Sequence, residues 1–119
     1  AETLTNAIGE GAINLAGVFS VSEFALLIRK SPLILSVNTG TIHIAAATST
    51  PVVVLYALTN IQHTPWHVRS EVLYFEVPPH LQSKNVLLQY TAKHLRTGGL
   101  KKAGVDNVLR AVNRMLQPV

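Results

Sequence analysis

A polar turn between two apolar runs is the part of the sequence whose residue types could do chemistry. The run 33–37 is apolar but for one serine, the turn 38–40 reads Asn-Thr-Gly, and residues 41–48 are rich in alanine and isoleucine. This order predicts a strand, a turn and a helix start, where unpaired amides and the positive end of the helix dipole attract anions. The groups that would contact such an anion belong to Asn38, Thr39, Gly40, Thr41 and His43.

Three of these residues also have simpler explanations. His43 fits a histidine at a helix start with a local hydrogen bond, and Gly40 fits a turn glycine required for its backbone angles. Asn38 fits a side-chain cap of the helix expected at 41–48. The sequence leaves both sets of explanations open.

Short alternating strand and helix patterns surround this turn and must position it. One helix begins with a capping box, because Glu23 follows Ser20 by three residues. The alternation predicts an α/β fold, with a parallel, Rossmann-like sheet between two helical layers. We expect strands at 13–16, 33–37, 52–56 and 72–75, the end of a helix in 1–11, and helices over 20–30, 41–48, 83–96 and 105–116.

A long loop at 57–69 follows a buried strand. We expect it at the same edge of the sheet as the turn 38–40, where parallel sheets usually bind ligands. Within the loop, Trp66 follows Pro65 and is expected to anchor the chain on the core, with a sugar-stacking role as the alternative. We expect no metal site, because no metal-binding spacing is present. The residues considered for one are His63, His67, His80, Glu71 and Glu76.

Length and composition limit the class of protein. With 119 residues, 48% of them hydrophobic, the chain is one domain at most and can fill a core. The absence of cysteine excludes disulfides and thiolate metal sites and fits a reducing compartment. No apolar run approaches the roughly 20 residues of a transmembrane helix. Neither a serine nucleophile elbow nor a Walker loop is present.

The net charge of +4 is concentrated at the C-terminal end. After position 80, Asp106 is the only acid among seven basic residues. Such a region attracts anions, although a solvated outer face of two helices is the favoured explanation, because such faces are normally charged. It supplies an alternative function, a non-catalytic module that binds an anionic membrane or nucleic acid. The basic residues are Lys84, Lys93, Arg96, Lys101, Lys102, Arg110 and Arg114.

Several stretches together resemble one family. They are Asn14-Leu15-Ala16-Gly17, the capped helix 20–30, Ser36 to Gly40 with His43, and Thr50-Pro51-Val52-Val53. In combination they resemble the C-terminal, donor-nucleotide domain of the family 9 glycosyltransferases, the heptosyltransferases of lipopolysaccharide core synthesis. The resemblance covers residues 1–76 well and extends more weakly to the final helix. It implies a GT-B enzyme that holds the diphosphate of an ADP-sugar on this domain.

The resemblance assigns roles to particular residues. It implies that Thr39, Gly40 and His43 contact the diphosphate, together with the neighbouring Asn38 and Thr41, and that Phe19 lies near the base or ribose. Three positions depart from the family pattern. The family usually has Asp at Asn38, Gly at Ser49, and Phe-Gly-Pro-Thr where this chain has Tyr56-Ala57-Leu58-Thr59, so that Thr59 is retained.

The resemblance also implies what surrounds the chain. We expect residues 1–119 to be a single partial domain, separate from the acceptor domain that supplies the catalytic residues, and inactive alone. The expected partners are a nucleotide-sugar and, through the full-length bacterial enzyme, a lipid-linked saccharide acceptor, without a cofactor or nucleic acid. We expect a cytoplasmic location, including the anionic inner face of the membrane. In the usual strand order two strands separate 13–16 from 33–37. The strand 13–16 must therefore pair directly with 33–37, or another chain must fill the gap, so unpaired edges favour a homo-oligomer.

Overall fold

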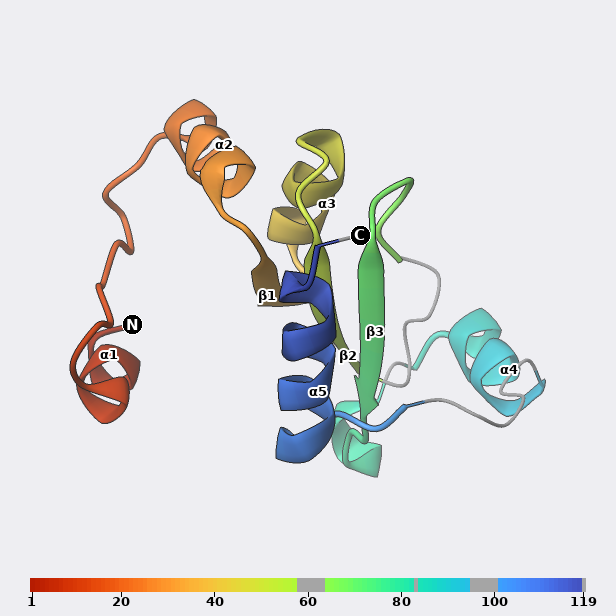
Figure 1. Ribbon diagram of the computed structural model, residues 1–119. Helices are drawn as coiled ribbons and strands as arrows, with labels where there is room; N and C mark the ends of the chain where they lie inside the picture. The colour runs from red at the N-terminus through yellow and green to blue at the C-terminus, as the bar shows by residue number, and fades with distance from the viewer. Residues whose placement is uncertain (58–63, 83, 95–100, 119) are drawn as a thin grey trace.

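The computed structural model describes residues 1–57, 64–82, 84–94 and 101–118 (Figure 1). A parallel sheet stands at its centre, with helices on both faces. The strands are β1 (Ile34–Val37), β2 (Val52–Ala57) and β3 (Ser70–Phe75). The helices are α1 (Glu2–Ile8), α2 (Val21–Lys30), α3 (Gly40–Ala47), the short η1 (Pro79–Leu81), α4 (Val86–His94) and α5 (Val105–Leu116).

The sheet has the order β1-β2-β3, and both pairs of neighbours are parallel. Ile34 lies opposite Val52 at the start of β1, and Val37 lies opposite Leu55 at its end. All strands therefore end at one common edge, the carboxyl edge. The predicted α/β class is confirmed, as are the expected strands at 33–37, 52–56 and 72–75 to within a few residues.

The central strand is buried on both faces because a helical layer covers each. Toward α2 and α3, Val52, Val54 and Tyr56 pack against Ile28 and Ile42. Toward α5, a second cluster contains Val53, Leu73, Ala111 and Met115. Continuous apolar sequence is what a strand between two helical layers requires. The three-layer architecture predicted from the sequence is confirmed.

The capping box at the start of α2 is also confirmed. The Ser20 amide donates to Glu23 Oε2 at 2.8 Å, and the Glu23 amide donates to Ser20 Oγ at 3.4 Å. Side-chain hydrogen bonding from Ser20 lowers the pKa of the Glu23 carboxyl below its ordinary value. The helix predicted over 20–30 therefore begins where its sequence signal places it.

The strand expected at 13–16 is absent, and that prediction is wrong. Ile13 and Leu15 are exposed, and residues 12–15 have no regular secondary structure. Figure 1 shows why: the segment leading from α1 to α2 runs well away from the free edge of β1. Without a neighbouring strand, the backbone of 13–16 has no ladder to join. Among the described residues, no strand pairs with the outer edge of β1.

Candidate functional site

The turn 38–40 lies at the carboxyl edge of the sheet. β1 ends at Val37, and α3 starts only three residues later, at Gly40. In Figure 1, α3 runs back along the sheet from this edge. The predicted strand, turn and helix start is therefore present, with the amino end of α3 directed toward the edge where parallel sheets bind ligands.

Asn38 does not cap this helix, contrary to one of the two explanations left open by the sequence. The N-cap residue is Thr39, with φ −137° and ψ 175°, and within the described residues no side chain caps α3. A cap at Asn38 requires the helix to begin at Thr39, but α3 begins one residue later, at Gly40. The side chain of Asn38 is therefore not placed to accept from the first backbone amides of the helix. The positive end of α3 thus has no capping side chain and can meet an external anion.

Hydroxyl groups hold the turn in shape. Ser36 Oγ donates to the carbonyl of Val37 at 3.0 Å and lies 3.4 Å from Thr39 Oγ1, which also reaches that carbonyl at 3.4 Å. Thr39 itself is exposed. Its long contacts are weak, so the hydroxyl can rotate to donate to an anion without breaking a strong hydrogen bond.

Neither the backbone conformation nor the packing of the chain requires a glycine at position 40. Its φ lies outside the left-handed region, and a Cβ added there would meet nothing within 4 Å. The explanation of Gly40 as a turn glycine needed for its backbone angles is therefore wrong. A glycine in open space at the first position of a helix leaves its amide approachable, which is useful for a bulky anion close to the backbone.

His43 lies one helical turn after Gly40, on the exposed side of α3. Among the described residues nothing forms a hydrogen bond with its ring, so the explanation of a locally bonded histidine is also wrong. Residues spaced by three and four positions share a helix face. Gly40 and the N-cap Thr39 therefore lie on the same side as His43, whereas Thr41 is partly buried.

Phe19 lies apart from this turn. It lines an open hollow of about 370 Å³ between α1 and α2, with Leu4, Phe24 and Leu27 among its neighbours. Thr59 falls outside the described residues. Of the residues predicted for the site, the structure thus brings together those from 38 to 43 and not Phe19.

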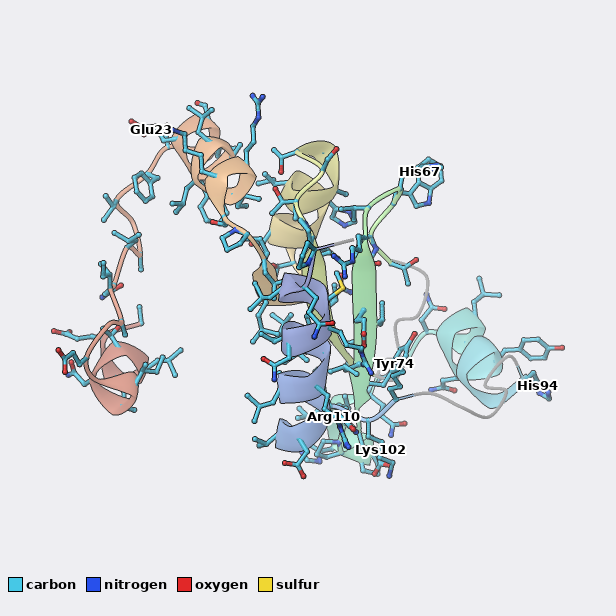
Figure 2. All side chains as sticks on the ribbon, in the orientation of Figure 1. Glu23, His67, Tyr74, His94, Lys102 and Arg110 are labelled. Carbon is cyan, nitrogen blue, oxygen red and sulfur yellow. The ribbon has the colours of Figure 1, made fainter. Side chains whose placement is uncertain are left out.

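The loop before β3 also differs from its expected place. The amide of Val52, at the start of β2, donates to the Arg69 carbonyl at 3.1 Å. Residues 64–69 therefore lie at the amino edge, opposite the turn 38–40, and Figure 2 shows His67 at the end of β3 remote from Tyr74. Trp66 is 78% exposed, whereas Pro65 is buried. The proline, not the tryptophan, anchors this loop.

Sequence comparison decides the family. The model of glycosyltransferase family 9 (heptosyltransferase) matches residues 1–98. The chain belongs to this family. Lipooligosaccharide heptosyltransferase 2 of Haemophilus influenzae is 34% identical to it over 64 residues, which are 54% of this chain and 18% of that relative. The match thus spans about a fifth of the relative's length. No solved structure matches the chain.

The family 9 match includes β1, the turn 38–40, α3 and the rest of the sheet. The resemblance recognised in the sequence is confirmed at the level of the family. One departure from the family pattern has a visible structural effect. Ser49, where the family usually has glycine, has a φ of +58°, a left-handed conformation that glycine adopts without strain.

The basic residues of this family 9 chain are partly neutralised, which the sequence did not reveal. Arg114 and Lys101 both bind Glu71, and Lys102 binds Glu76. Hydrogen bonding from Arg114, with a smaller effect of Lys101, lowers the pKa of the Glu71 carboxyl. Glu71 and Glu76 lie before position 80, so they are far in sequence from the basic residues that they neutralise. These pairs weaken the case for a purely electrostatic membrane or nucleic-acid module.

A metal site and a membrane-spanning helix are both absent from the part of the chain that the structure describes. No group of His, Asp and Glu side chains there could hold a metal ion. No helix there is long and apolar enough to cross a membrane. His63, one of the residues considered for a metal site, lies outside the described residues.

Proposed function

We propose that this chain is the donor-binding part of a glycosyltransferase. Its reaction would move a heptose or a similar sugar from a nucleotide diphosphate sugar, of the ADP-heptose type, to a lipopolysaccharide-type acceptor. The observation that carries the proposal is the uncapped start of α3 at the carboxyl edge, with Gly40 in open space. The family match gives this anion site its chemical context.

In the proposed reaction the diphosphate is the leaving group, and negative charge develops on it as the glycosidic bond breaks. The first amides of α3 would donate to its oxygens, and the dipole of the helix would stabilise the added charge. Thr39 and His43 would donate from the same side of the helix. The amides at the start of α3 are fixed by the fold before the ligand arrives, so little reorganisation of these donors opposes the reaction.

The other half of the chemistry would come from outside this chain. We place the acceptor site and the catalytic base in a separate domain of the full-length bacterial enzyme, and we expect residues 1–119 alone to bind the donor without turnover. A lipid-linked acceptor would bring such an enzyme to the inner face of the membrane. No cofactor is included in this proposal.

Isothermal titration calorimetry with ADP and an ADP-sugar tests donor binding. We expect saturable binding that is weakened several-fold in Thr39→Val and in His43→Leu, since each loses a donor to the diphosphate. Thr64→Val is the matched control, because this exposed threonine lies at the opposite edge of the sheet. Absence of heat with any of several nucleoside diphosphates would contradict the proposal, as would equal losses in the Thr39 and Thr64 variants.

A further inference from the structure

Ser36 is the only polar residue in the apolar run 33–37 that forms β1. Ile34, two positions earlier, packs in the cluster toward α2 and α3. Because side chains alternate along a strand, Ser36 is directed to the same side, and its register partner on β2 is the buried Val54. A partly buried hydroxyl beside apolar side chains needs a hydrogen-bond partner. Ser36 obtains one by donating to the Val37 carbonyl at 3.0 Å.

Thr39, the N-cap residue of α3, does not use its side chain as N-cap residues ordinarily do. The hydroxyl of an N-cap threonine usually accepts from the second or third amide of its own helix. The Thr39 hydroxyl forms no such bond, and Thr39 Oγ1 instead lies 3.4 Å from Ser36 Oγ and 3.4 Å from the Val37 carbonyl oxygen. Since the proton of Ser36 is donated to Val37, the oxygen of Ser36 is left to accept the proton of Thr39. Ser36 therefore holds the Thr39 hydroxyl toward β1 and away from the helix.

The first amides of α3 stay open as a result. Within the described residues, the amides of Gly40 and Thr41 find no acceptor, whereas the Ile42 amide donates to the Thr39 carbonyl at 3.2 Å. A Thr39 side chain in the ordinary capping position would accept from the Thr41 amide. That bond would occupy one of the donors that an anion at the helix start requires.

We propose that Ser36 is a positioning residue of the donor site, which keeps Thr39 from capping its own helix and so leaves the Thr41 amide available to the diphosphate. This role rests on the proposed function, because it concerns the same anion site. Without the Ser36 hydroxyl, Thr39 would keep one long contact, to the Val37 carbonyl. A capping bond to the Thr41 amide is then the better alternative, and the site closes before the ligand arrives.

Calorimetric titration of ADP into Ser36→Ala tests this role. We expect binding to be weaker by about fivefold, the factor to which a helix cap of ordinary strength corresponds. Ser36→Thr keeps the hydroxyl, suits a strand and should bind ADP like the original chain. Ser70→Ala is the matched control, because Ser70 is a partly buried serine at the amino edge of the sheet, where β3 begins. Its ADP binding should be unchanged.

Two calorimetric results would overturn the role of Ser36. Unchanged ADP binding in Ser36→Ala would leave the donor site in place and remove the need for Ser36. An equal loss in Ser36→Ala and Ser36→Thr would show that the packing of the side chain matters and its hydroxyl does not.

A double-mutant cycle shows whether Ser36 acts through Thr39. In a Thr39→Val background no hydroxyl is left to cap α3, so Ser36→Ala should weaken ADP binding no further. The same loss in this background as in the original chain would mean that Ser36 acts by another route, and would overturn the proposal.

Hydrogen exchange of the Thr41 amide, measured by NMR without ligand, separates this role from donor binding. In Ser36→Ala the amide should exchange several-fold more slowly, since the released Thr39 hydroxyl accepts from it. In the Ser36→Ala, Thr39→Val double variant it should exchange at the original rate. If the original chain binds ADP and Ser36→Ala leaves the exchange unchanged, the role of Ser36 alone fails. If the original chain binds no ADP, the proposed function fails and this role fails with it.

Discussion

Glu71 on β3 and Arg114 on α5 form a two-pronged ion pair across 43 positions of the chain, with Nε to Oε1 and Nη2 to Oε2 both at 2.7 Å. Lys101 adds a longer contact to Glu71, at 3.4 Å. Arg69 strengthens the same junction, because its guanidinium donates to the carbonyls of Arg114 and Gln117 at the end of α5. This junction fixes which flank of α5 faces β3 and which faces β1.

The ion pair predicts a pH-dependent stability. The Glu71 side chain is 16% exposed, and Arg114 holds the pKa of its carboxyl below the ordinary value of 4.5. A lowered folded-state pKa gives stability that is present above pH 4.5 and is lost as the pH falls toward the folded-state value. We expect Glu71→Gln to lower the free energy of unfolding by about 1 kcal/mol at pH 7 and by much less at acid pH.

Urea denaturation at pH 7 and at acid pH measures how much Glu71→Gln lowers the free energy of unfolding under each condition. Glu76→Gln is the control, because the Glu76 and Lys102 side chains are 70% and 80% exposed and such pairs contribute little. A loss in Glu71→Gln that is equal at the two pH values would show that the pair does not act through the charge of Glu71.

A second prediction concerns the strained residue before β2. Ser49 has a φ of +58°, where a side chain costs about 1 kcal/mol and glycine costs nothing. We expect Ser49→Gly to raise the free energy of unfolding by about 0.5–1 kcal/mol. Ser22→Gly, inside α2, should lower it by a similar amount, since glycine weakens a helix. Thermal unfolding measures the change in stability of both variants, which should have opposite signs. A Ser49→Gly variant less stable than the original chain would show that Ser49 is not strained.

Tyr56 provides a third prediction. Its hydroxyl is buried, finds no hydrogen-bond partner among the described residues, and has its pKa raised by burial. A buried hydroxyl without a partner is unfavourable, so Tyr56→Phe should leave stability unchanged or raise it by up to about 1 kcal/mol. Tyr74→Phe, on the next strand at a ring distance of 6.3 Å, is the control and should change stability little. A clear loss of stability in Tyr56→Phe alone would reveal an unseen partner.

The sequence predicted those parts of the fold that rest on local signals. The capping box at Ser20, the apolar runs of β1 and β2 and the apolar stripe of α5 each indicate their own element. The strand expected at 13–16 failed because a strand also needs a neighbour, and apolar sequence alone does not supply one. The runs 33–37 and 52–56 did form strands, because each has a parallel neighbour to pair with.

The candidate site could be predicted only where it follows directly from a strand. The residues from 38 to 43 could be placed at one edge, because they follow a strand directly. The place of Trp66 could not be predicted, since residues 64–69 belong to the start of β3 rather than to the end of β2. The pairing of Arg114 with Glu71 was equally hidden, because α5 and β3 meet only in the folded chain.

The proposed function depends on a donor site at Gly40. Calorimetric titration of ADP into Gly40→Ala, compared with Gly104→Ala, tests it most directly. Both glycines stand at the start of a helix in open space, so both alanine variants should fold, and only the first obstructs the proposed diphosphate site. We expect at least tenfold weaker ADP binding in Gly40→Ala and unchanged binding in Gly104→Ala. Equal affinity of the two variants for ADP would contradict a diphosphate site at the start of α3.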